Sequence, residues 1–380
     1  MAFSLLDGLR VLDMSQYAPG PYASLLLADL GADVVRVEPP GGEPMRRIGP
    51  ADADGISAWY KVLNRSKRIV ELDLKTEDGK AAFRALLEQS DALLESYRPG
   101  VLDRLGFSRA ALEKINPRLV HCALSGWGQT GPYAMRGGHD LNYMALCGGL
   151  VTSGTADTPT ISFPQVADYS SGVQAALSVV AALLGRERRG RDGKGVFVDT
   201  SIAESVLPWQ AWTMTGMVRP GFGLPRGQTF LNGGVAYYNI YPTRDGRHVT
   251  IGAIEEKFWQ AFCAAVDRPD WVDRQHEDAP QAALMQEVAD LFMSRDFDDW
   301  ATLLADVDCC FEPVHDMAEV AAHPHIAARG MVRPSDGDDP FVEIAFPAWI
   351  DGAPMPPRTA PAPVSAAAVL SGWAEGDETP

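Results

Sequence analysis

Two ionisable side chains stand next to each other in the glycine-flanked segment GGHDLNYMALCGG, residues 137–149. A histidine such as His139 can donate or accept a proton near neutral pH, so this segment could carry general acid–base chemistry. A single histidine in an apolar setting is also commonly a structural residue, and the dipeptide alone leaves both interpretations open. Adjacent residues seldom face the same site, so we assign Asp140 to a turn or to a position behind the site.

A second candidate carboxylate, Asp168, opens the segment DYSSGVQAALSVVAALLGR, which reads as a loop running into an apolar helix that ends near Gly185. A helix leaves its first amides without partners inside the helix, and an aspartate at this position can simply cap them. A helix N-terminus would also help to keep such a carboxylate ionised, whereas burial would act against ionisation. The sequence does not decide which effect is stronger.

Cations gather in the segment YKVLNRSKR, residues 60–68, and Arg36 lies upstream of it. One interpretation is a solvated surface run. The other is a compact anion site for a phosphorylated small molecule, because a local cluster can be cationic although the whole chain is acidic.

Composition narrows the class of protein. The chain has 380 residues, 46% of them hydrophobic, and a formal net charge of −17, which disfavours nucleic acid and anionic membranes as partners. The five cysteines are scattered without CxxC spacing, so we predict neither a disulfide framework nor a metal site. The N-terminus lacks a basic region, and no apolar run approaches the roughly 20 residues of a membrane span, so we expect a cytoplasmic protein.

The elements that must position these residues alternate between strand and helix. The segments GLRVLDM, YASLLLADLG and ADVVRVEPP read as a βαβ unit, and the pattern continues through IVELDL, a helix from about Lys75 to Gln89, DALLES and RLVHCALSG. This order predicts an α/β domain with a mostly parallel sheet. No GxGxxG follows the first strand, so NAD is not the expected ligand.

The composition changes after about Gly221. A hairpin, VAYYNIYPTRDGRHVTIGAI, has Asp245-Gly246 at its turn, and short amphipathic helices such as EEKFWQAFCAAV follow. We therefore predict a large α/β domain over residues 1–220, to which residues 325–380 return, and a smaller α+β domain over residues 221–324.

Several ordered blocks together resemble the class III CoA-transferase superfamily, which includes CoA-transferases and α-methylacyl-CoA racemases. These blocks span most of the chain: LLDGLRVLDMSQYAPGPYASLLLADLGADVVRVEPPGG, NRSKRIVELDLKTEDGK, ESYRPGVLDRLGF and SGWGQTGPYAMRGGHDLNYMALCG. The resemblance implies a doubly wound, Rossmann-like large domain that holds CoA, a smaller domain, and an interlocked homodimer. It implies an acyl-CoA substrate and no further cofactor.

Within this superfamily the segment GHDLNY resembles the racemases. Their histidine and aspartate stand on opposite faces of the α-carbon of a 2-methylacyl-CoA, and the matching residues here are His139 and Asp168. Each would remove a proton in one direction and return one in the other, through an enolate. By the same resemblance Glu255 would hydrogen-bond the imidazole, although the neighbouring Glu256 is an alternative. We expect the amides that open the helix after Asp168 to stabilise the enolate oxygen.

The resemblance also implies a set of residues that bind CoA. Cationic side chains would contact its phosphates, Tyr97 would lie against the nucleotide or pantetheine, and two polar residues would line the thioester end. The phosphate group is Arg36, Lys67, Arg98 and Arg104, and the thioester group is Gln16 and Tyr143.

Two other functions stay open. A class III CoA-transferase would move CoA between carboxylic acids through an Asp168 acyl anhydride and an aspartyl-CoA thioester. A non-catalytic CoA-binding protein is the other, because the segment ISFPQVADYSSG departs from the GDFGGG more usual in the racemases.

Overall fold

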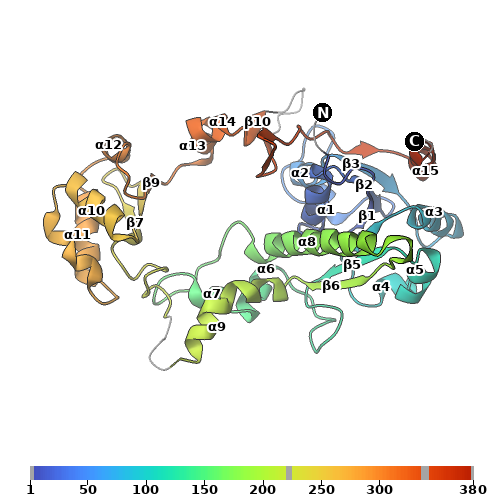
Figure 1. The fold of residues 1–380 in the computed structure, drawn as a ribbon, viewed down its shortest axis with the longest axis horizontal. Helices are drawn as coiled ribbons and strands as arrows, with labels where there is room; N and C mark the ends of the chain where they lie inside the picture. Colours follow the sequence, from blue (N-terminus) through green and yellow to red (C-terminus); the bar gives the residue numbers. More distant parts are fainter. Residues whose placement is uncertain (1–3, 220–224, 335–341, 378–380) are drawn as a thin grey trace. The chain divides into compact units, whose positions relative to one another are not determined.

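The chain forms two compact units in the computed structural model, which describes residues 4–219, 225–334 and 342–377 (Figure 1). The segments Met1–Cys147, Pro164–Trp209 and Pro324–Pro380 make up the larger unit, and Gly148–Phe163 and Gln210–His323 make up the smaller. Residues 148–163 and 210–219 thus group with the smaller unit, whereas we predicted them in the large domain. Within the smaller unit, Arg226 Nε donates to the carbonyl oxygen of Thr155 at 2.6 Å. The predicted boundary between residues 220 and 221 lies outside the described residues.

The larger unit is built on a seven-stranded sheet in the order β14-β3-β2-β1-β4-β5-β6. Every neighbouring pair is parallel, which confirms the predicted α/β class. The order reverses direction between β1 and β4, and ligands of open α/β sheets bind at the carboxyl edge beside such a point. The strands are β1 (Arg10–Met14), β2 (Asp33–Glu38), β3 (Lys67–Glu71), β4 (Ala92–Glu95), β5 (Val120–Ser125), β6 (Phe197–Ser201) and β14 (Ala362–Pro363).

Helices cover both faces of this sheet because strand side chains alternate between the faces. Leu12 and Met14 of β1 join an apolar core with Phe83 and Phe107, whereas Asp13 between them accepts a hydrogen bond from Ser24 of α1 at 2.5 Å. The helices near the sheet are α1 (Pro19–Asp29), α2 (Ala58–Asn64), α3 (Glu77–Glu88), α4 (Val101–Arg104), α5 (Arg109–Ile115), α6 (Asp140–Leu146) and α8 (Val166–Arg188).

The start of α3 shows how the local sequence sets these elements. Thr76 is the N-cap, and its side chain accepts a hydrogen bond from the Gly79 amide at 3.1 Å. Two acidic residues follow in the first turn, where their negative charges interact favourably with the positive end of the helix dipole. The helix then buries Phe83 and Leu86 against the sheet.

The C-terminal segment completes the larger unit. Its strand β14 pairs with β3, and its helix α15 (Ala366–Asp377) packs against α3 (Figure 1). Val369 and Trp373 of this helix are buried in the core, and Trp373 Nε1 donates to Asp33 at 2.7 Å. Two small antiparallel sheets precede it, β10 (Val332–Pro334) with β11 (Val342–Ile344) and β12 (Trp349–Ile350) with β13 (Ala353–Pro354).

One helix, α8, meets the length and apolarity of a membrane span, although we expected no such segment. It packs against α1, β5 and β6, and 44% of its most apolar window is buried inside the structure. Core helices of globular proteins satisfy the same criterion, so the match is weak support for a membrane span.

The smaller unit combines an antiparallel sheet with helices. Its strands are β7 (Tyr238–Pro242), β8 (His248–Gly252) and β9 (Phe311–Pro313), and the predicted hairpin joins β7 to β8. Gly246 has a φ of +80°, which suits glycine at this tight turn. Aromatic residues such as Trp259, Trp271 and Phe292 fill the core. The helices include α7 (Gly149–Thr152), α9 (Ala211–Met217), α10 (Glu256–Ala265), α11 (Ala282–Phe292), α12 (Phe297–Leu304) and α13 (Met317–Ala322).

Candidate active site

A cavity of about 440 Å³ opens at the carboxyl edge of the large sheet, beside the reversal between β1 and β4. Its walls come from the loops that follow β1, β4 and β5 and from the residues around the start of α6 and α8. His139 and Asp168 both line it. The structure therefore brings the two predicted acid–base residues, which are far apart in the sequence, to the same cavity.

His139 is held at the N-cap of α6. Its backbone amide donates to the side-chain oxygen of Asn142 at 3.0 Å, and the edge of its ring meets Tyr17 with the ring centres 6.2 Å apart. Gly138 permits this arrangement, because a β-carbon there would lie 2.8 Å from the ring of Tyr143. The Tyr143 hydroxyl donates to the Gly138 carbonyl oxygen at 2.7 Å and fixes the loop.

Asp168 lies inside the first turn of α8, which begins at Val166, and not in the loop before the helix as predicted. Asp140 explains the earlier start. One of its carboxylate oxygens accepts hydrogen bonds from the amides of Ala167 at 2.7 Å and Asp168 at 3.2 Å. This contact confirms the structural role assigned to Asp140, since it anchors the turn that carries Asp168.

We predicted that backbone amides after Asp168 stabilise an enolate. For the first of these amides, that of Tyr169, the prediction is wrong. Because the helix starts before Asp168, the Tyr169 amide donates to the Gln165 carbonyl oxygen inside the helix at 3.1 Å. The two preceding amides are taken by Asp140.

The environment of Asp168 favours its protonated form. Burial, followed by the negative charge of Asp140, raises the pKa of Asp168 to about 7. The raised pKa is the direction that we expected from burial. A carboxyl with this pKa can accept and release a proton near neutral pH, as a two-way acid–base catalyst must.

Two predicted phosphate ligands, Arg36 and Lys67, are wrongly assigned. Both side chains are completely buried. Arg36 pairs with Asp13 at 2.9 Å, Glu38 at 2.9 Å and Glu43 at 3.1 Å, and donates to the Ser15 carbonyl oxygen at 2.9 Å. Their charges are neutralised within the protein and cannot reach a bound nucleotide.

Lys67 occupies the other side of the same network. Its ammonium contacts Asp13 at 3.2 Å, the Asn64 side chain at 3.0 Å and the Pro21 carbonyl oxygen at 2.9 Å, which accounts for three donors. Burial alone would raise the pKa of Asp13, but Arg36 and Lys67, together with hydrogen bonds from Ser15 and Ser24, outweigh burial and hold that pKa well below its usual range. We call Asp13, Arg36, Glu38, Glu43 and Lys67 the buried ion network.

Four other predicted residues do line the cavity, namely Gln16, Tyr97, Arg98 and Tyr143. The Gln16 amide donates to Ser96 Oγ at 2.8 Å and ties the loop after β1 to the loop after β4. Gln16 and Tyr97 also line an adjoining hollow of about 200 Å³ at the ends of β1, β2 and β3. Arg104, at the end of α4, is exposed and does not line either space.

Sequence reasoning missed three residues of these cavities. Tyr17 has a φ of +62°, a conformation uncommon outside glycine, and contacts His139. Arg136 lines the main cavity and Lys75 lines the adjoining hollow. The segment SQYAPGP, with two prolines and a glycine, indicated an unusual turn but gave no reason to prefer Tyr17 over Gln16.

Glu255 belongs to the smaller unit, where it is the N-cap of α10 and is exposed. With Glu256, Lys257 and His276 it lines a shallow hollow of that unit. Its predicted hydrogen bond to His139 stays a prediction.

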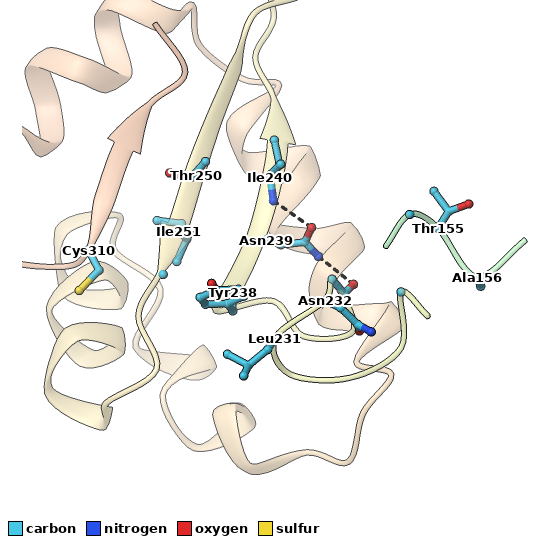
Figure 2. Close-up of a pocket in the computed structure, with 14 residues that line it drawn as sticks. Thr155, Ala156, Leu231, Asn232, Tyr238, Asn239, Ile240, Thr250, Ile251 and Cys310 are labelled. Atoms are coloured by element: carbon cyan, nitrogen blue, oxygen red, sulfur yellow. Dashed lines mark hydrogen bonds between the residues drawn. The ribbon is translucent and has the colours of Figure 1, made fainter. Parts of the chain in front are cut away.

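The smaller unit also has a cavity of about 810 Å³, shown in Figure 2. Asn239 shapes its wall: its side chain accepts from the Ile240 amide at 2.9 Å and donates to the Gly233 carbonyl oxygen at 3.1 Å. No carboxylate, histidine or cation is among its lining residues in the described part of the chain. Cys310 is exposed, but desolvation and the nearby carboxylates of Glu255 and Asp308 raise its pKa, which disfavours the nucleophilic thiolate near neutral pH. Acid–base chemistry is therefore better supported in the larger unit.

Comparisons with known proteins give both a racemase and a CoA-transferase as relatives. The chain is 33% identical to human alpha-methylacyl-CoA racemase over 88% of this chain and 84% of that protein. It is equally 33% identical to succinyl-CoA:mesaconate CoA-transferase of Haloarcula hispanica, over 96% of this chain and 93% of that protein. The crystal structure of a CAIB/BAIF family protein from Brucella suis superposes with a TM-score of 0.82 at 26% identity, covering 97% of this chain and 99% of that one. A family model described as CoA-transferase family III matches residues 6–366, so the chain belongs to that family of acyl-CoA enzymes.

Proposed function

We propose that this protein is an isomerase that inverts the α-carbon of a 2-methylacyl-CoA thioester by two-base proton transfer. The observation that carries the proposal is that His139 and Asp168 line one cavity. The pKa of about 7 at Asp168 supports it, because the same carboxyl must act as base in one direction and as acid in the other.

The proposed reaction needs a proton removed from one face of the carbon and a proton returned to the other. When Asp168 acts as the base, it takes the α-proton, the electron pair moves onto the thioester carbonyl to give an enolate, and protonated His139 supplies the new α-proton. The reverse direction exchanges the two roles. The hydrogen bonds from Ala167 and Asp168 to Asp140 hold the carboxyl in position during this exchange.

Loop residues are proposed to hold the CoA moiety. Arg98 lines the cavity and is exposed. Its guanidinium lies beside Gly137, two residues before His139, and would be 3.3 Å from a β-carbon added to that glycine. Arg104 would contact a phosphate from the end of α4, and Arg136 and Lys75 are further candidates. Tyr97, Gln16 and Tyr143 would contact the pantetheine and the thioester, and Glu255 would orient His139.

An interlocked homodimer is proposed as the assembly, and exposed apolar side chains support it. On α8 of the larger unit, Val173, Leu177 and Leu184 are each about half exposed or more. In the smaller unit, Trp212 and Met217 of α9 are more than two-thirds exposed. Such side chains on a single chain are typical of a surface that a partner covers.

A CoA-transferase is the alternative, and the equal identity to a succinyl-CoA:mesaconate CoA-transferase favours keeping it. In that reaction the Asp168 carboxylate would attack a thioester carbonyl and later carry CoA as an aspartyl thioester. Hydroxylamine or borohydride would trap this thioester on the protein, whereas the isomerase forms no covalent intermediate.

Incubation in deuterated water separates the two functions. Purified protein is given several 2-methylacyl-CoA thioesters, with and without succinate or formate, and the products are analysed by mass spectrometry. The isomerase gives one deuterium at the α-position and no new thioester. Transfer of CoA to the added acid without α-label would contradict the proposal, and neither reaction across a broad panel would favour a CoA-binding protein without catalysis.

A further inference from the structure

Three potential metal ligands converge in the smaller unit, apart from the acid–base residues. Glu312 lies on β9, His315 follows that strand, and His323 is the C-cap of α13. One ligand atom from each of the three lies within 4.8 Å of those from the other two. His315 Nε2 is 3.6 Å from Glu312 Oε1, and the two imidazole centres are 5.3 Å apart.

A fourth residue, Glu319, orients the central histidine. One of its carboxylate oxygens lies 3.5 Å from His315 Nδ1, a buried nitrogen that has no well-aligned hydrogen bond. Metal-bound histidines usually direct the other ring nitrogen to a carboxylate, which keeps the proton there and leaves the opposite nitrogen free to bind the metal. With Nδ1 facing Glu319, Nε2 faces Glu312.

Glu319 is itself fixed in place. Arg247 donates to one of its oxygens at 2.8 Å, and the Asp316 amide donates to the other at 2.8 Å within the capping box of α13. Phe297 meets the His315 ring edge-on at 6.1 Å between centres and limits its rotation. The carboxylate and the imidazole are therefore already arranged before any ligand arrives.

The pair His276 and Glu256 in the same unit shows what an ordinary exposed contact looks like. Their closest atoms are 3.4 Å apart, and both side chains are about two-thirds exposed. Neither residue is among the groups that bring three potential ligands together in the described part of the chain.

Although the cysteine pattern led us to predict no metal site, we propose that Glu312, His315 and His323 bind a divalent transition-metal ion of the zinc type, with Glu319 positioning His315. Two imidazoles and one carboxylate match zinc better than the hard cations calcium and magnesium, which prefer oxygen ligands. Water would complete the coordination. Because the ligands come from β9 and from the end of α13, the metal would fasten these elements to each other and stabilise the smaller unit.

The test uses the full chain after treatment with a chelator, titrated with zinc chloride in a calorimeter and with cobalt chloride in an absorption spectrometer. We expect a single zinc ion per chain, visible-range cobalt bands, and a melting temperature that rises with zinc but not with magnesium. His315→Ala should abolish zinc binding. His323→Gln should also abolish it, and this second variant keeps the test valid if His315→Ala folds poorly. Glu319→Gln should weaken it about tenfold or more while every proposed ligand remains.

His276→Ala is the matched control, because it removes an exposed histidine paired with a single carboxylate. It should leave zinc affinity unchanged. Absence of stoichiometric binding with zinc at tenfold molar excess over the protein, or an equal loss in His276→Ala and His315→Ala, would overturn the proposal.

Discussion

Two groups of charged residues lie close to the carboxyl edge of the large sheet, and they differ in where their charges are directed. In the buried ion network, Arg36 and Lys67 have their donors occupied by carboxylates and carbonyl oxygens of the protein. Around the cavity, His139 and Arg98 are exposed on loops. The pKa of Asp168 is raised by burial and by Asp140, and no cation opposes this rise. Charge that is buried and paired within the protein holds the fold together, whereas exposed charge beside the cavity is available to a ligand.

The network also serves the cavity indirectly. Arg36 donates to the Ser15 carbonyl oxygen, and Glu43 accepts from the Tyr17 amide at 3.4 Å, so the loop after β1 is held from below. Tyr17 keeps its left-handed backbone and its contact with His139 in this loop. A buried group thus positions an exposed one.

The largest expected effect separates catalysis from stability at the cavity. We expect His139→Ala and Asp168→Asn each to lower the rate of α-carbon inversion by about 10²–10⁴-fold, because each removes one of the two proton-transfer groups. Chiral chromatography of a 2-methylacyl-CoA measures the rate. Urea unfolding should change by no more than about 0.5 kcal/mol for His139→Ala, because this side chain is exposed. Inversion at the wild-type rate in either variant would remove that residue from the mechanism.

The opposite pattern is expected in the buried ion network. Arg36→Met leaves the carboxylates of Asp13, Glu38 and Glu43 buried without their main cation, which should cost about 3–5 kcal/mol of unfolding free energy. Urea denaturation followed by circular dichroism measures it. Arg98→Met is the control and should stay within about 0.5 kcal/mol. Equal stability of the two variants would refute the distinction drawn between buried, paired charges and exposed charges beside the cavity.

CoA binding provides the next test of the same comparison. Arg98→Met or Arg104→Met should weaken CoA by about 10-fold to 100-fold, since a charge-assisted hydrogen bond contributes about 1.5–3 kcal/mol. Calorimetric titration with CoA measures the affinity, and Arg109→Met, on α5 away from the cavity lining, is a control of equal charge change. Unchanged affinity in both test variants would place the phosphates elsewhere.

The smallest expected effect concerns pH. Asp140→Asn keeps an oxygen that can accept from Ala167 and Asp168 but removes the charge that contributes to the raised pKa of Asp168. Inversion that uses Asp168 as base falls as pH drops below about 7, because the carboxyl becomes protonated. In the variant this decline should move to lower pH by no more than about one unit, since burial still acts. A pH–rate profile that moves upward would contradict the assigned cause.

Much of the fold could be predicted from sequence because hydrophobic periodicity and turn residues act locally. The βαβ order, the start of α3 at Thr76 and the turn at Gly246 all depend on neighbours in the chain. His139 and Asp168 were predicted from the GHDLNY motif and its partner in the family pattern, and the structure places both of them at one cavity.

The errors arise where a distant residue decides the outcome. We assigned Arg36 and Lys67 to the phosphates of CoA because they are cationic residues in a family of acyl-CoA enzymes. Nothing in the neighbouring sequence shows that Asp13 lies within hydrogen-bonding distance of both. In the same way α8 starts before Asp168 because Asp140, 28 residues earlier, accepts its first amides. Tyr17 was missed because its importance comes from its backbone conformation and its contact with His139.

Proton exchange resolved by substrate epimer tests the central claim most directly, namely that His139 and Asp168 act on opposite faces of one carbon. Each pure epimer of a 2-methylacyl-CoA is incubated in deuterated water with the wild type, His139→Ala or Asp168→Asn, and α-deuterium and chirality are measured together. We predict that each variant loses inversion yet still exchanges the α-proton of one epimer, and that the two variants retain opposite epimers. Retention of the same epimer by both variants, or label appearing with undiminished inversion, would contradict the account.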